Sequence, residues 1–153
     1  MREKIIAATK VAMKAKNELE LSTLRLMSTA IKSKDIDLRG TEGSEDGVSE
    51  EVILGVLATM VKQRRDSAES YRKGKRMDLA ERELKEIDVI TKFLPKQLSE
   101  DEVTEAIDAA VVSSGASSIK DMGKVMAELK GQYAGQMDFS EASTRVKAAL
   151  SAL

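Results

Sequence analysis

Two charged residues stand on otherwise apolar helical faces, and they are the first candidates for chemistry in this chain. At 100° per residue, Arg64 lies within the apolar face of residues 53–71. Glu83 lies within the apolar face of residues 80–94, whose predicted inward side chains are Ala80, Leu84, Ile87, Ile90 and Leu94. A buried charge is costly unless it is paired, so we predict that Arg64 and Glu83 form a structural ion pair. A catalytic role is the alternative, but a guanidinium and a carboxylate alone lack a nucleophile, a metal and a general base. We therefore predict no catalytic residue.

Basic residues are concentrated between residues 62 and 76, where seven of them stand against Asp66 and Glu69. If the helix continues to residue 76, an outward sector of about 100° holds five cations, a pattern typical of a surface that binds RNA phosphates. The five are Lys62, Arg65, Arg72, Lys73 and Arg76. The alternative is a solvated face, because Lys62–Asp66 and Arg65–Glu69 have the spacing of local ion pairs. The nearby aromatic residue, Tyr71, lies on the apolar face, which gives base stacking little support.

Composition narrows both the fold and the chemistry. Of the 153 residues, 33% are charged and 3% are aromatic, with a single proline, which favours helices over sheets. The chain has no histidine, the usual general base and the commonest zinc ligand, and no cysteine. We expect no cofactor and no metal. Because the sequence contains no apolar run of membrane-spanning length and no signal-peptide pattern, we also expect a cytoplasmic protein without membrane contact.

Charge changes along the chain and predicts a domain boundary. Residues 1–97 contain 20 basic and 17 acidic residues, whereas residues 98–153 contain 5 and 9. The shift coincides with Pro95, which disfavours helical geometry at the preceding residue. We therefore predict an all-α protein with a four-helix N-terminal domain at residues 1–95, a hinge at residues 96–98 and a three-helix C-terminal domain at residues 99–153.

Helix-capping signals place the individual elements. The first helix is expected at residues 2–16, and Asn17, Ser49 and Asp78 are expected to open the next three. Gly74 is expected to end the third helix. Residues 39–47 hold three glycines and no apolar side chain, which predicts a loop. In the C-terminal part, the predicted helix starts are Ser99, Ser118 and Asp138. The predicted inward side chains of the last two helices include Ile119, Val125, Leu129 and Val146.

Three separated segments resemble the GatB/YqeY family, and in particular the small stand-alone YqeY-like proteins of bacteria. They are KQRRDS at residues 62–67, DLAE at residues 78–81 and FLPKQL at residues 93–98. Further on, MGKVM at residues 122–126, followed by Lys130, Gly131 and Gly135, is similar to the C-terminal tail of the GatB subunit of the glutamine-dependent aminoacyl-tRNA amidotransferase.

In that subunit the tail helps to grip tRNA. The resemblance implies that Lys124 and Lys130 contact RNA and that Gly123 permits close helix packing. Two departures count against a direct transfer: this tail is acidic overall, and its last helix opens with DFSE at residues 138–141 instead of a more basic, proline-bearing entry. The alternative is a three-helix domain in which Met122, Val125 and Met126 belong to the core.

The resemblance implies an accessory tRNA-binding or tRNA-amidotransferase-associated protein, whose relatives are linked to glutamine-dependent carbon–nitrogen ligase activity. Nothing similar to the large catalytic domain of the amidotransferase subunit is present, and the sequence has no phosphate-binding loop or nucleophile elbow. The alternative function is a protein-interaction adaptor whose acidic three-helix module docks a basic partner. The expected partner is therefore tRNA or a protein, and the oligomeric state stays open.

Overall fold

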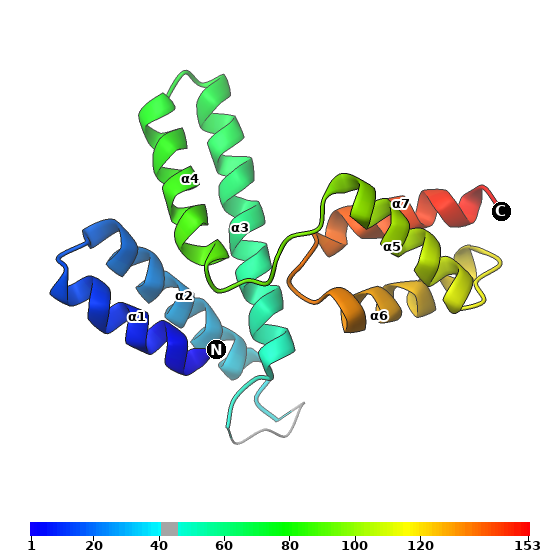
Figure 1. Cartoon of the computed structure of the whole chain (residues 1–153), viewed down its shortest axis with the longest axis horizontal. Helices are drawn as coiled ribbons and strands as arrows, with labels where there is room; N and C mark the ends of the chain where they lie inside the picture. The colour runs from blue at the N-terminus through cyan, green and yellow to red at the C-terminus, as the bar shows by residue number, and fades with distance from the viewer. Residues whose placement is uncertain (41–45) are drawn as a thin grey trace. The chain divides into compact units, whose positions relative to one another are not determined.

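The computed structural model describes residues 1–40 and 46–153, and its regular secondary structure within these ranges is helical throughout (Figure 1). This confirms the all-α fold class. The predicted loop at residues 39–47 includes residues 41–45, which lie outside the described residues. The elements in chain order are α1 (Arg2–Lys14), α2 (Glu18–Asp37), α3 (Glu50–Lys73), α4 (Met77–Thr91), α5 (Glu100–Ser113), the 3-10 helix η1 (Ile119–Asp121), α6 (Met122–Tyr133) and α7 (Phe139–Ser151).

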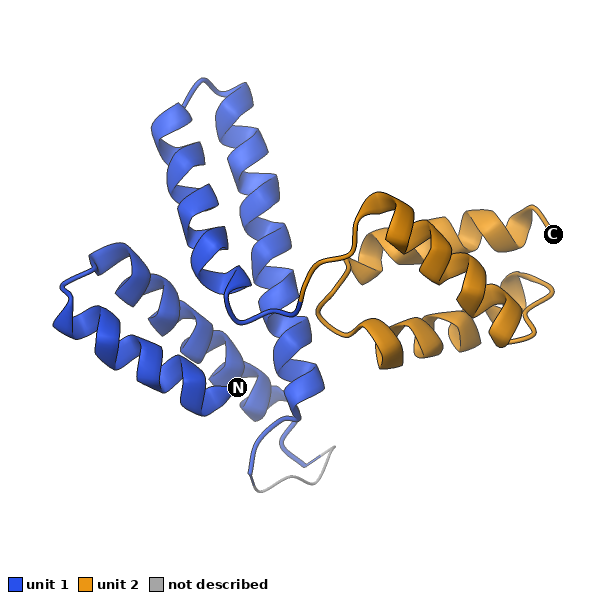
Figure 2. Ribbon diagram, viewed as in Figure 1, with its two compact units in different colours: residues 1–95 blue, residues 96–153 orange. Residues whose placement is uncertain are grey.

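The chain divides into two compact units after Pro95 (Figure 2). Residues 1–95 hold α1 to α4, and residues 96–153 hold α5, η1, α6 and α7. Each unit encloses its own cluster of buried apolar side chains. Independent folding of the two units, as separate domains joined by a hinge, stays a prediction.

The first unit consists of two helical hairpins, α1–α2 and α3–α4 (Figure 1). The paired helices of each hairpin lie side by side, and α2 also packs against α3 and α4. Its core takes residues from all four helices, as expected for amphipathic helices that bury one face each. The fully buried large side chains of this core are Ile5, Leu24, Met27, Leu57 and Ile90.

The buried face of α4 is broader than the sequence pattern predicts and is shifted along the helix surface. Glu86 and Val89 are buried, whereas Leu84, which was predicted to be buried, is 36% exposed. The reason is that α4 packs against both α2 and α3, so its contact surface exceeds a single stripe. Three predicted positions within the helix are buried: Ala80, Ile87 and Ile90.

Side chains cap the helices at most of the predicted positions. The Asn17 side chain accepts a hydrogen bond from the Glu20 N–H, and Ser49 accepts one from the Val52 N–H. Ser99 and Glu102 form a reciprocal capping box, which satisfies two backbone donors at the start of α5. The backbone N–H of Ser99 lowers the pKa of Glu102, because this hydrogen bond favours the carboxylate.

The turn between α3 and α4 differs from the prediction in two details. Gly74 follows the last residue of α3 as predicted, but its φ is −80°, and Lys75 takes the left-handed conformation with φ 58°. The helix α4 then begins after Arg76, and Asp78 lies within its first turn instead of capping it. The Arg76 N–H donates to the Tyr71 carbonyl at 2.8 Å, and the Lys75 N–H donates to the Arg72 carbonyl at 3.1 Å. This is the Schellman arrangement, with lysine where glycine is usual.

A carboxylate holds together three chain segments of the first unit. Asp35, near the end of α2, accepts hydrogen bonds from both terminal nitrogens of Arg2 at 2.6 and 2.9 Å, and a third from the Val48 N–H at 2.8 Å. The Arg2 guanidinium, followed by the Val48 N–H, lowers the pKa of Asp35. A lowered pKa means that this stabilisation is present above the unfolded-state pKa and is lost as pH falls through the folded-state value.

We predict that Gly47→Ala destabilises the first unit more than Gly40→Ala does. Both glycines have φ near +90°, which costs alanine about 1 kcal/mol at either position. At Gly47, however, a Cβ would also lie 2.7 Å from Arg2 Nη2 and 2.9 Å from Asp35 Oδ1, whereas at Gly40 no atom of the described residues lies within 4 Å of it. Urea unfolding of the two variants measures the difference. Equal losses would show that the segment before α3 does not depend on this ion pair.

The second unit packs α5, α6 and α7 around one apolar cluster. Its fully buried residues include Val125, Leu129 and Val146, which lie at predicted inward positions. Ile119, which was also predicted to be inward, is 46% exposed because it belongs to the short η1. The Leu98 N–H donates to the Gln136 carbonyl at 2.9 Å, so the segment before α5 is bonded to the segment between α6 and α7.

We predict that residues 1–95 and residues 96–153, expressed as separate polypeptides, each remain helical and unfold cooperatively. The physical reason is that each unit encloses its own buried apolar cluster. Circular dichroism during urea titration tests both fragments. An unfolded fragment from a stable full-length protein would contradict the boundary at Pro95.

Candidate nucleic-acid interface

The C-terminal half of α3 presents four of the predicted phosphate-binding residues. Arg65, Arg72 and Lys73 are exposed and Lys62 is half-buried. On an α-helix these positions fall within one outward sector and span roughly 16 Å along the axis. The local reason for this exposure is that the opposite face of α3, which includes Leu57, Met60 and Ala68, is buried.

Local ion pairing leaves much of this cationic face available. Arg65 and Arg72 make no ion pair with any residue that the structure describes. The predicted Arg65–Glu69 pair is replaced by Lys73–Glu69 at 3.0 Å, with both side chains at least 67% exposed. An exposed pair of this kind is worth a few tenths of a kcal/mol at most i,i+4 positions, so a phosphate can compete for Lys73.

Arg76 does not belong to this face, in contrast to the prediction. The helix α3 ends at Lys73, and the turn at Lys75 reverses the chain before Arg76. The Arg76 guanidinium instead hydrogen-bonds to Asp78 at 3.3 Å. This hydrogen bond lowers the pKa of Asp78 and raises that of Arg76. The sector therefore contains Lys62, Arg65, Arg72 and Lys73, which we call the α3 cationic face.

Arg64, next to Arg65 in the sequence, points into the hairpin. Its Nε donates to Glu86 Oε2 at 2.9 Å, and its Nη1 donates to the Met60 carbonyl at 3.2 Å. The side chains of Arg64 and Glu86 are only 13% and 11% exposed. Arg82 donates to the other oxygen of Glu86 at 3.4 Å, so this carboxylate accepts from two arginines.

The predicted partner of Arg64 was therefore wrong: the hydrogen bond goes to Glu86 and not to Glu83. Periodicity shows which face of a helix a residue occupies, but the level at which two helices meet depends on the turn that joins them. Lys75 is the left-handed residue of this turn. Arg64 before it and Glu86 after it are separated from Lys75 by the same number of residues. Burial, followed by the neighbouring charge of Glu86, raises the pKa of Glu83, while Arg64 and Arg82 oppose this shift.

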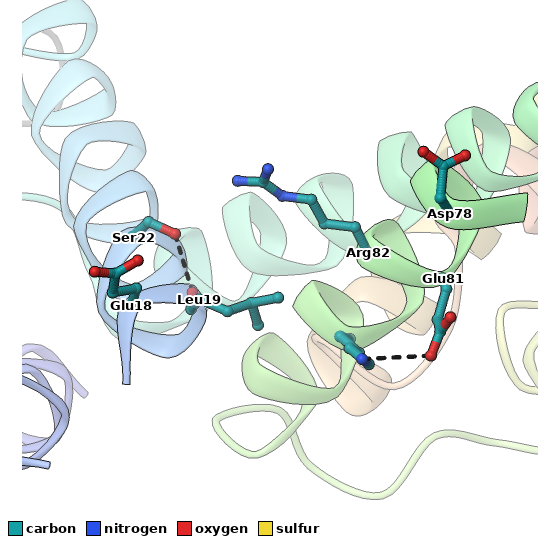
Figure 3. Close-up of a pocket in the computed structure, with 7 residues that line it drawn as sticks. Glu18, Leu19, Ser22, Asp78, Glu81 and Arg82 are labelled. Atoms are coloured by element: carbon teal, nitrogen blue, oxygen red, sulfur yellow. Dashed lines mark hydrogen bonds and ion pairs between the residues drawn. The ribbon is translucent and has the colours of Figure 1, made fainter. Parts of the chain in front are cut away.

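An open groove of about 610 Å³ lies between the start of α2 and α4 (Figure 3). Figure 3 shows Arg82 extending from α4 toward α2 across this groove. Glu81 is paired with Lys85 at 3.3 Å, and the Ser22 hydroxyl donates to the Leu19 carbonyl at 3.0 Å. The Ser22 proton is thus directed to a backbone oxygen, so the groove has mixed charge but no nucleophile held by a base. Sequence reasoning overlooked Arg82, although its i,i+4 spacing to Glu86 was a usable signal.

The two predicted RNA contacts of the tail lie on α6, in the second unit. Lys124 and Lys130 are both exposed. Lys124 is paired with Asp121 at 3.7 Å, whereas Lys130 makes no ion pair with a described residue. Asp121 also accepts from the Ser117 and Ser118 N–H groups, and the Ser117 hydrogen bond is the main cause of its lowered pKa.

The packing role implied for Gly123 was wrong. Gly123 is exposed, and a Cβ at this position would meet no atom of the described residues within 4 Å. The helix α6 faces the core of the second unit with Val125 and Leu129, and Gly123 is not among its buried residues. Glycine at this position is therefore not required by packing against the described residues.

Within the described parts of the chain, no helix is long and apolar enough to cross a membrane, and no group of three or more acidic side chains is placed to hold a metal ion.

Comparison with protein families supports the resemblance found in the segments at residues 62–98. The model of the Yqey-like protein family matches residues 2–150. The chain belongs to this family. The match covers both units of this YqeY-like protein and thus confirms the family resemblance inferred from separated segments.

Yeast proteins named "Altered inheritance of mitochondria protein 41, mitochondrial" are similar to this chain. The protein of Clavispora lusitaniae is 40% identical over 100 residues, which cover 64% of this chain and 55% of the relative. That of Vanderwaltozyma polyspora is 36% identical over 85 residues, covering 56% and 43%. That of Saccharomyces cerevisiae is 29% identical over 126 residues, covering 78% and 65%. The chain spans about half the length of the first two relatives.

The names of these relatives contradict the predicted cytoplasmic location, because they are mitochondrial proteins. The prediction rested on the absence of a long apolar run and of a signal-peptide pattern in this sequence. Neither feature distinguishes one reducing aqueous compartment from another, so the inference had no physical basis for selecting the cytoplasm.

We predict that removing either member of the Arg64–Glu86 pair costs about 3 kcal/mol of unfolding free energy, because an unpaired charge is left in the hairpin. In a double-mutant cycle, Arg64→Met and Glu86→Leu should show a coupling of at least about 1 kcal/mol in urea unfolding. Additive effects would show that the contact does not contribute to stability.

Glu83→Gln is the matched control in this experiment. In the wild type the pKa of Glu83 is raised, which means that the ionised carboxylate is disfavoured in the folded state. The contribution of Glu83 to folding stability is therefore fully present below its unfolded-state pKa and is lost as pH rises through its folded-state pKa. Glu83→Gln should therefore not lower stability at neutral pH, and its stability relative to the wild type should rise between acidic and neutral pH. A loss as large as that of Glu86→Leu would restore Glu83 as the partner.

Proposed function

We propose that this YqeY-like protein is an accessory RNA-binding protein that holds the phosphate backbone of tRNA on the α3 cationic face and has no catalytic site of its own. The observation that carries the proposal is the pair Arg65 and Arg72. Both side chains are exposed and make no ion pair with a described residue, and they lie two helical turns apart on a rigid hairpin. Guanidinium groups on such a support suit bidentate phosphate contacts.

The choice of tRNA as the RNA, and of an amidotransferase as the associated enzyme, rests on the resemblance of residues 122–135 to the tail of the amidotransferase subunit. Lys124 and Lys130 would form a second contact region on α6. Because Lys124 is already paired with Asp121, Lys130 is the stronger candidate of the two.

We predict that the full-length protein binds bulk tRNA at low salt and loses most of its affinity at moderate salt. Replacing Arg65, Arg72 and Lys73 with alanine should weaken binding and reduce the slope of log K against log salt by about 2–3, since each phosphate contact contributes about one unit. A fluorescence anisotropy titration at several salt concentrations measures both quantities.

The matched control removes the same number of charges from α1, through Lys4→Ala, Lys10→Ala and Lys14→Ala, at exposed positions. If α3 is the interface, this control keeps most of the affinity. Equal losses from both triple variants would show that only net charge matters and would contradict a defined α3 site. Absence of tRNA binding at low ionic strength would reject the RNA proposal and favour the adaptor function, in which the acidic second unit docks a basic protein.

A further inference from the structure

The α1–α2 hairpin has an apolar groove that the proposed RNA site does not use. A cavity of about 200 Å³ lies between the two helices, lined by Arg2, Ile5, Ile6, Ser28, Ile31 and Lys32. Ile5 and Ile31 form its buried floor, whereas Ile6 is 54% exposed. Met13, seven residues after Ile6, lies on the same side of α1 and is 52% exposed. Ile6 thus lines the cavity, and Met13 presents a second large apolar side chain to solvent further along the same side of α1.

Apart from Asp35, which is paired with Arg2, the charge along this groove is positive. Residues 4–16 and 21–34 contain seven basic residues and no acidic residue. The acidic residues of the two helices stand at their ends, and Asp35 among them is bonded to Arg2. Lys10, Arg25 and Lys32 make no ion pair with a described residue. The hairpin therefore combines exposed apolar side chains with positive charge that the described part of the protein leaves without counter-charges.

From this combination we propose that the α1–α2 groove binds an acidic amphipathic helix of a partner protein. The apolar residues of such a helix, spaced i, i+3, i+4 and i+7, would contact Ile6 and Met13, and its carboxylates would face Lys10, Arg25 and Lys32. RNA fits this surface less well, because residues 1–38 contain no aromatic side chain for base stacking and phosphates gain nothing from Ile6 and Met13. The site is separate from the α3 cationic face, so the two proposals can fail independently.

The test uses the full-length protein and three fluorescein-labelled synthetic peptides of equal length. The first peptide is an amphipathic helix with glutamate on its polar face, and the second carries lysine in place of glutamate. The third has the amino-acid composition of the first, but its residues are scrambled so that a helix would have no apolar face. Fluorescence anisotropy near physiological salt should show the first peptide binding at least about tenfold more tightly than the other two. Equal affinities for all three would overturn the proposal.

Variants of the protein then locate the contact. The double variant Ile6→Ser, Met13→Ser should weaken the acidic peptide about tenfold, a difference of about 1.4 kcal/mol. Because both residues are more than half exposed, the fold should persist, and circular dichroism checks this. Charge reversal through Arg25→Glu and Lys32→Glu should transfer the preference to the lysine peptide, whereas Arg65→Glu with Lys73→Glu should leave the acidic peptide's affinity unchanged.

Vesicles of equal parts phosphatidylcholine and phosphatidylglycerol test the membrane as an alternative occupant. If vesicle binding depends on Ile6 and Met13 while the protein binds the acidic peptide no more tightly than the other two peptides, the surface is a lipid-binding face and the proposal is rejected. If tRNA binding is lost on charge reversal at Arg25 and Lys32 while peptide binding is unaffected, the groove belongs to an RNA surface and the proposal is likewise rejected.

Discussion

The contact between Arg64 and Glu86 is the constraint on which the α3 cationic face depends. Both side chains are largely removed from water, so each needs the other, and their pairing holds the Arg64 side chain inside the hairpin. Once Arg64 is directed inward, the helical rotation directs Arg65 outward. Two adjacent arginines thus serve different purposes: one holds the hairpin together, and the next is available to a phosphate.

Asp35 supplies the second constraint, because it joins the start of α1, the end of α2 and the segment that leads into α3. The two hairpins of the first unit are therefore connected by a charged joint as well as by the apolar core. Gly47 combines a positive φ with a close approach to the Arg2–Asp35 ion pair, so a larger residue at this position would contact both members of the pair too closely. The apolar faces provide most of the burial, while these polar contacts select one arrangement of the helices.

Two cationic surfaces of the first unit differ in what surrounds the charge. The α3 cationic face carries its arginines on a solvated helix surface, which suits a phosphate backbone. The α1–α2 hairpin places its charges around exposed isoleucine and methionine, which suits a helix with carboxylates on its polar side. Net charge alone would treat the two as equivalent. Membership in the YqeY-like family applies to the whole chain and does not by itself assign either surface to a ligand.

The sequence by itself determined the helical class, most helix ends and the inward faces of α3 and α7, because periodicity and capping are local properties. It also identified Arg64 as a charge that must be paired, and it placed Arg65 and Arg72 on the outward side. It misplaced Arg76 because the outward sector was extended past Gly74, whereas the chain reverses at Lys75, whose left-handed conformation no composition rule requires.

The tertiary structure decided which carboxylate meets Arg64 and which side of α4 is buried. Glu83 and Glu86 are less than one helical turn apart, so periodicity separates them poorly. What distinguishes them is their axial level relative to α3, and that level is set by the turn together with packing against α2. The open side of the α1–α2 hairpin was decided in the same way: an apolar residue such as Ile6 is exposed only because no other described helix covers that edge. Such choices depend on contacts between segments distant in the sequence, which a local pattern does not contain.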